Sequence, residues 1–134
     1  MSTTDIGIIT ANELNTWWAY RAATSGDAAL ADRLDTLSAW AERFEPSATL
    51  PTLDRLGVAV ALDRELLDTL RTVIGQITSD LDLVTRKVSE ITGVAMQRPA
   101  VTMAHLVTPY FAVAEFAEEH GLVLVSPGEH VAAA

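Results

Sequence analysis

Residues 66–91 read LLDTLRTVIGQITSDLDLVTRKVSEI, and this stretch decides the fold of the chain. Its apolar side chains recur at alternating intervals of three and four, the period of a helix that buries one stripe. If Leu67 is the first position of a heptad, every first and fourth position is Leu, Ile or Val. These positions are Leu67, Leu70, Ile74, Ile77, Leu81, Val84, Val88 and Ile91. The pattern predicts a coiled-coil-like helix over about 63–92, capped by Asp63 and ended by Gly93.

The same stripe is the predicted oligomer interface. In its second half Asp80 and Lys87 flank the apolar positions, so the stripe has the narrow width of a helix that meets copies of itself. β-Branched residues at the fourth heptad positions favour a trimer over a dimer. The alternative is a helix whose stripe is covered inside one chain, as in a monomeric bundle.

A helical pair is predicted before the long helix. Residues 5–9 read as a short strand or a packed arm, because they are rich in β-branched side chains. Thr10 and Glu13 have the spacing of a capping box, which predicts a helix over about 11–24. Asp27 then caps a second helix, which ends before a proline-containing connector.

The chain is predicted to be mainly α, with a small C-terminal α+β element. Thr108 and Pro109 begin a helix that Gly121 ends, and residues 122–125 read as an apolar strand. Residues 53–62 fit either a helical turn or a short strand. The expected parts, which could together form one compact domain, are an N-terminal helical module (1–45), a connector (46–62), the long helix (63–92) and a C-terminal helix–strand module (93–134).

Composition limits the possible partners. The chain has 134 residues, 49% hydrophobic, and a net charge of −9. Nucleic-acid binding requires clustered basic side chains, and the only such cluster is Arg86–Lys87, so no nucleic-acid partner is expected. No apolar run reaches the roughly 18 residues of a membrane span, and no secretory leader is recognisable. The expected location is the cytoplasm, at least when the protein is made.

No catalytic, cofactor or metal motif is found. The chain has no cysteine, which removes thiolate ligands and cysteine nucleophiles. His105, His120 and His130 lack the His-x3-His or Glu-x-x-His spacing of helical metal sites, and His120 is explained as a favourable partner for a helix C-terminus. No phosphate-binding loop or nucleophile elbow occurs. We therefore expect a protein that is not an enzyme and has no cofactor or metal.

The aromatic side chains are the other candidates for contacts with a partner protein. Trp17 and Tyr20 lie at the edge of the first predicted helix, where they could touch a partner protein or wedge into a small core. Tyr110, Phe111 and Phe116 are predicted to be core residues of the C-terminal helix.

Two hypotheses about function follow. The preferred one is a non-enzymatic oligomeric structural or assembly protein that self-associates through the heptad stripe, for example as a subunit or adaptor of a larger particle such as a phage tail or fibre. That last step is an analogy from architecture. The alternative is a small acidic regulatory protein that binds and inhibits a protein partner. An exposed apolar patch around Trp17 and Tyr20, with the heptad buried inside one chain, would favour the alternative.

Overall fold

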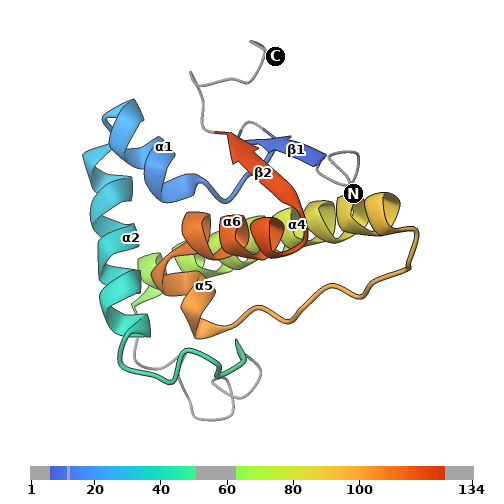
Figure 1. Cartoon of the computed structure of the whole chain (residues 1–134). Coiled ribbons are helices and arrows are strands. Elements are labelled where there is room, and N and C mark those ends of the chain that lie inside the picture. Colours follow the sequence, from blue (N-terminus) through green and yellow to red (C-terminus); the bar gives the residue numbers. More distant parts are fainter. Residues whose placement is uncertain (1–6, 12, 51–62, 126–134) are drawn as a thin grey trace.

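The computed structural model describes residues 7–11, 13–50 and 63–125. It is mainly helical with one small parallel sheet, which confirms the predicted fold class (Figure 1). The expectations for residues 53–62 and for His130 lie outside the described residues. The elements, in chain order, are β1 (Gly7–Thr10), α1 (Trp18–Ser25), α2 (Ala28–Ala41), α4 (Arg64–Thr92), α5 (Met103–Val107), α6 (Pro109–Glu119) and β2 (Leu122–Val125).

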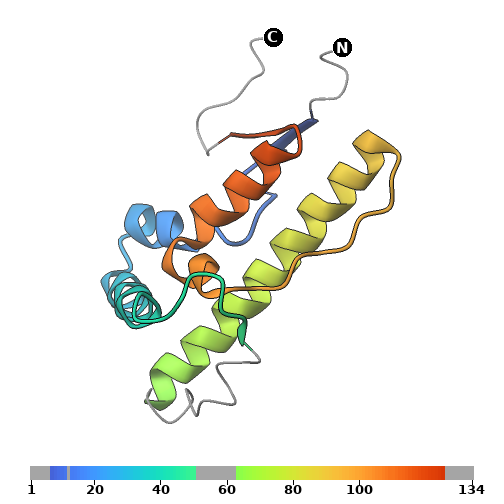
Figure 2. The same ribbon diagram turned by 60° about the horizontal axis from the view of Figure 1, so that its bottom comes forward.

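The long helix α4 is the element on which the others assemble. It has 29 residues, and α2, α5 and α6 all contact it (Figure 2). At its start the carboxylate of Asp63 accepts a hydrogen bond of 2.8 Å from the N–H of Leu66. At its end Gly93 adopts a left-handed conformation with φ of 74°, which glycine tolerates without strain. Both predicted ends of this helix are confirmed.

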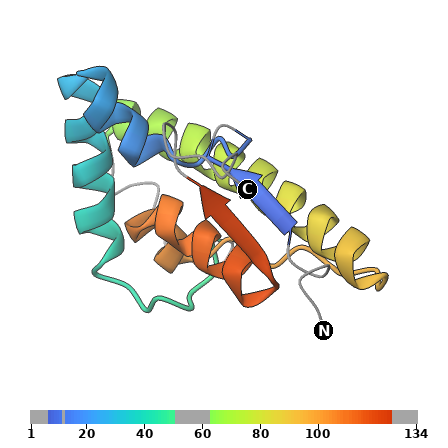
Figure 3. The ribbon, with the colours of Figure 1, turned by 45° about the horizontal axis from the view of Figure 1, so that its top comes forward.

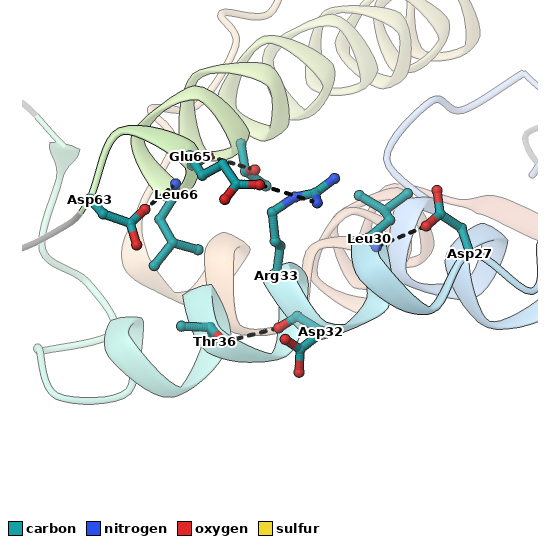
Figure 4. A network of polar contacts seen from close by, with 9 residues as sticks. Asp27, Leu30, Asp32, Arg33, Thr36, Asp63, Glu65 and Leu66 are labelled. Carbon is teal, nitrogen blue, oxygen red and sulfur yellow. Dashed lines mark hydrogen bonds and ion pairs between the residues drawn. The ribbon is translucent and has the colours of Figure 1, made fainter.

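Helices α1 and α2 form a hairpin beside the long helix. The carboxylate of Asp27 caps α2 by accepting a hydrogen bond of 3.0 Å from the N–H of Leu30, as the sequence predicts. An ion pair of 3.8 Å between Arg33 and Glu65 joins α2 to the first turn of α4 (Figure 4). Because the Glu65 side chain is 80% exposed, this ion pair contributes little to stability.

The first helix starts later than the sequence predicts. The predicted contact between Thr10 and Glu13 is formed, with a hydrogen bond of 2.9 Å from the Thr10 N–H to the Glu13 carboxylate. However, α1 begins at Trp18, so the expected start near residue 11 is wrong. The chain turns after the capping contact because its next backbone N–H groups bond to a side chain of α4, as described below.

The two strands join the beginning and the end of the described chain. They pair in parallel, with Gly7 opposite Leu122 and Thr10 opposite Val125 (Figure 3). The N–H of Ala11 continues the ladder with a hydrogen bond of 2.7 Å to the carbonyl of Val125. β2 follows α6 directly and packs against it. Both strands were expected from the sequence, but their pairing was not.

Every described element contributes to one hydrophobic core. Ile9 of β1 and Leu122 of β2 lie in the same cluster as the buried side chains of the helices. The segment 93–102 returns from the end of α4 to α5 (Figure 1), and Val101 joins this core. The largest fully buried side chains are Ile9, Leu14, Leu37, Val73, Ile77, Leu81, Val84, Val88, Met103, Val113 and Leu122.

Replacing Gly75 with alanine is expected to stabilise the fold by about 0.5–1 kcal/mol, because glycine is a poor helix former. Gly75 is an exposed residue within α4, and a Cβ atom there would meet nothing within 4 Å. The urea midpoint of unfolding should therefore rise. A lower midpoint would mean that this position is covered in solution.

Candidate functional site

The heptad stripe lies inside the single chain. Four of its side chains, Ile77, Leu81, Val84 and Val88, have no exposed surface. The remaining positions are either buried or partly buried against the same core; they are Leu67, Leu70, Ile74 and Ile91. The narrow width of the second half of the stripe predicted a contact between copies of the chain. In the structure, elements of the same chain cover this half. Self-association through the stripe stays a prediction, and it would require these side chains to leave the core.

A buried carboxylate in α4 holds the turn that precedes α1. Asp80 is 1% exposed, and its two oxygens accept hydrogen bonds from the backbone N–H groups of Asn15 and Thr16 and from the Thr16 hydroxyl. These N–H groups are consequently not available for helical bonds to earlier carbonyls, which explains the late start of α1. Trp17, the residue before α1, follows immediately, so Asp80 also positions this aromatic side chain.

Burial raises the pKa of Asp80 to about 6 from an ordinary 3.8, although the N–H groups of Asn15 and Thr16 oppose the rise. Between these two pH values the folded chain keeps a proton that the unfolded chain has lost. The stabilising contribution of Asp80 is therefore fully present below pH 3.8 and is lost as pH rises through 6. Glu13 lies nearby and pairs with Lys87 at 2.9 Å. Although partial burial raises its pKa, the hydrogen bond from the Thr10 N–H and the contact with Lys87 hold the pKa below its ordinary 4.5, so the contribution of Glu13 to stability is lost as pH falls.

We therefore expect the unfolding free energy to increase by about 2 kcal/mol as pH falls from 7 to 4.5, from the contribution of Asp80. Urea unfolding measured across this range would show the effect. The Asp80→Asn variant cannot titrate at this position and should show a smaller increase. Equal pH dependence in the two proteins would contradict the assignment to Asp80.

Four aromatic rings form a continuous row across α1 and α6. Ring centroids are 5.4 Å apart for Trp17 and Tyr20, 6.0 Å for Tyr20 and Tyr110, and 5.2 Å for Tyr110 and Phe111. The guanidinium of Arg21 lies 5.4 Å from the Trp17 ring centroid, within the range of a cation–π contact. We call Trp17, Tyr20, Tyr110 and Phe111 the aromatic row.

The prediction that Phe111 is a core residue is wrong. Phe111 was expected in the core, yet it is 66% exposed. The buried face of α6 carries Val113, Ala114 and Ala117, whereas Phe111 lies on the opposite face. The sequence held a signal for this, because Phe111 shares its face with Glu115 and Glu118 at helical spacing. Tyr110 and Phe116 are partly buried, so the core assignment holds for them in part.

Two hollows adjoin each other beside α5, and the aromatic row lines one of them. One, of about 320 Å³, is lined by Ala19 and Tyr20 of α1 and by residues 107–111. The other, of about 240 Å³, lies between the end of α2 and α5, with Phe44 and Met103 in its lining. Val107 and Thr108 line both hollows, so the two lie next to each other. Together we call them the groove.

The two described histidines, His105 and His120, have structural explanations. Nδ1 of His105 accepts a hydrogen bond of 3.0 Å from the N–H of Thr102 at the start of α5, and burial lowers its pKa. Nδ1 of His120 lies 2.9 Å from the carbonyl oxygen of Phe116 in the last turn of α6. Within residues 7–11, 13–50 and 63–125, no group of three or more histidine, aspartate or glutamate side chains could hold a metal ion.

Comparisons with protein-family models, with curated proteins and with solved structures found no match to this chain. Among the described residues, no helix is both long and apolar enough to cross a membrane. The described residues form a mainly α domain closed by a two-stranded parallel sheet.

Proposed function

We propose that the chain is a non-enzymatic, acidic regulatory protein that binds a protein partner through the aromatic row and thereby blocks it. The single observation that carries this proposal is that Phe111, at the end of the row, is 66% exposed beside an apolar hollow. Large aromatic side chains that combine exposure with a neighbouring pocket are typical of binding surfaces.

The burial of the heptad stripe supports the same choice. A stripe that already packs in the core of one chain does not need a second copy to cover it, so the main reason for expecting an assembly protein has an intramolecular explanation. Tyr20, in contrast, is 37% exposed at the position where a partner contact was expected. Trp17 is partly buried, and its ring packs against that of Tyr20.

The aromatic row is also rigidly mounted, which favours binding. Asp80 fixes the turn before Trp17, and Pro109 fixes the first turn of α6 before Phe111. Side chains held in place before binding lose little conformational entropy when a partner arrives. The row therefore presents a preformed surface.

The proposal is tested by panning a phage-displayed library of random peptides on the wild-type protein. Peptides retained by the wild type should lose binding to Phe111→Ala, which removes the exposed ring from α6. The matched control is Val94→Ala, because Val94 is 62% exposed in the segment after α4, away from the row. Peptides that bind both variants equally would argue against the aromatic row as a binding surface.

Self-association through the stripe has its own test. A parallel trimer would have about three times the 14.4 kDa mass of one chain, at all concentrations. Light scattering on a size-exclusion column over a wide concentration range measures this mass. A monomer would leave the protein-binding proposal as the remaining hypothesis.

A further inference from the structure

The groove contains two apolar hollows that share a wall. The hollow at the aromatic row is bounded by Tyr20 and Phe111, and the hollow at the end of α2 is bounded by Phe44 and Met103. Each has room for one apolar side chain. Because Val107 and Thr108 separate them, a single short peptide segment could fill both with two of its side chains.

Two exposed carboxylates share the face of α2 that borders the groove, and one of them lines a hollow. Ser38 of α2 donates a hydrogen bond of 3.1 Å to the carbonyl of Val107, which places this face of α2 at the shared wall. Asp35 and Glu42 are exposed and lie three residues before and four residues after Ser38, so they share its face. Glu42 also lines one hollow.

The α6 side of the groove is acidic as well. Glu115 is exposed one turn after Phe111 and lies on the same face. Residues 99–125 contain no Lys or Arg. Arg43 follows Glu42 in the sequence, and Arg21 is already placed over the Trp17 ring. The contact of Arg21 shows that a ring of the aromatic row accepts a guanidinium on its face.

We propose that the occupant of the groove is a segment of a partner protein in which two apolar side chains are flanked by Lys or Arg. The apolar side chains fill the two hollows, while the cations face Asp35, Glu42 and Glu115. An acidic segment, a nucleic acid or an anionic membrane would be repelled by these carboxylates and by the net charge of −9. This inference rests on the proposed function and names the partner class for the same surface.

The test uses the phage-selected peptides that depend on Phe111. They should be enriched in Lys and Arg over the starting library, and their fluorescence anisotropy should show tighter binding at low salt than at high salt. The triple variant Asp35→Asn, Glu42→Gln, Glu115→Gln should bind the same synthetic peptides about tenfold more weakly at low salt. The control Glu90→Gln removes an exposed carboxylate of α4 and should leave the affinity unchanged.

The outcomes separate the two proposals. Phe111-dependent peptides without an excess of Lys and Arg, or with the same affinity for the triple variant, would overturn this inference and leave the proposed function standing. If no retained peptide depends on Phe111, the proposed function itself fails. A dimer of the protein that Phe111→Ala converts to a monomer would place a second copy in the groove and would also overturn the inference.

Discussion

Replacing Ile77 with aspartate is expected to unfold most of the protein. Ile77 has no exposed surface and lies in the middle of α4 within the common core. A carboxylate there would lose its hydration without gaining a partner, which costs at least about 4 kcal/mol. Small domains have total stabilities of only about 5–15 kcal/mol, and burying an unpaired charge costs well above that minimum, so the change is expected to exceed the stability of the domain. Far-ultraviolet circular dichroism should show the loss of helix.

The same variant distinguishes the two arrangements of the heptad stripe. If the stripe joined copies of the chain, Ile77→Asp would give a folded protein of lower mass rather than an unfolded one. Light scattering and circular dichroism on one sample would separate these results. The control is Ser79→Asp, which adds the same charge at an exposed position of α4 and should change stability by no more than about 0.5 kcal/mol.

Replacing Asp80 with alanine is expected to lower the unfolding free energy at neutral pH by about 2–4 kcal/mol, because it leaves several buried donors without an acceptor. These donors are the N–H groups of Asn15 and Thr16 and the Thr16 hydroxyl. The substitution also removes a charge that is costly to bury, which offsets part of the lost unfolding free energy and accounts for the lower end of the range. Urea unfolding gives the free energy directly.

The Asp80 variant should also disturb the aromatic row, because the turn it releases leads directly into Trp17. Tryptophan fluorescence in the absence of denaturant is therefore expected to shift. Asp82→Ala is the matched control: Asp82 is an exposed aspartate of the same helix, paired with Arg98 at 2.8 Å, and its loss should cost no more than about 1 kcal/mol. Equal effects of the two substitutions would contradict the role assigned to Asp80.

The elements that the sequence predicts well are those whose ends are set by local chemistry. Asp27 and Asp63 cap their helices through bonds to residues three positions later. Pro109 likewise begins α6, and Gly93 ends α4. In each case the deciding contacts lie within a few residues of each other, so a local pattern contains them.

The features that the sequence missed depend on distant contacts. Asp80 binds the turn before α1 across more than sixty positions, and this contact overrides the local preference for an earlier helix start. The covering of the heptad stripe by the same chain is also a long-range property, because a helix cannot show in its own sequence which elements will pack on it. Phe111 differs for a local reason: its aromatic character favours the core, but it lies on the face of α6 opposite the buried Val113, Ala114 and Ala117.

The parallel pairing of β1 and β2 has a consequence for synthesis of the chain. Paired residues are about 115 positions apart, so β1 leaves the ribosome long before its partner strand exists. At typical elongation rates of about 5–20 residues per second, this interval lasts roughly 6–23 s. During that time Ile9 and its neighbours have no strand to pair with, and the core cannot close. β1 is thus made before every helix of the described chain but is secured only when β2 has formed, and until then it is an unpaired strand that needs protection from aggregation.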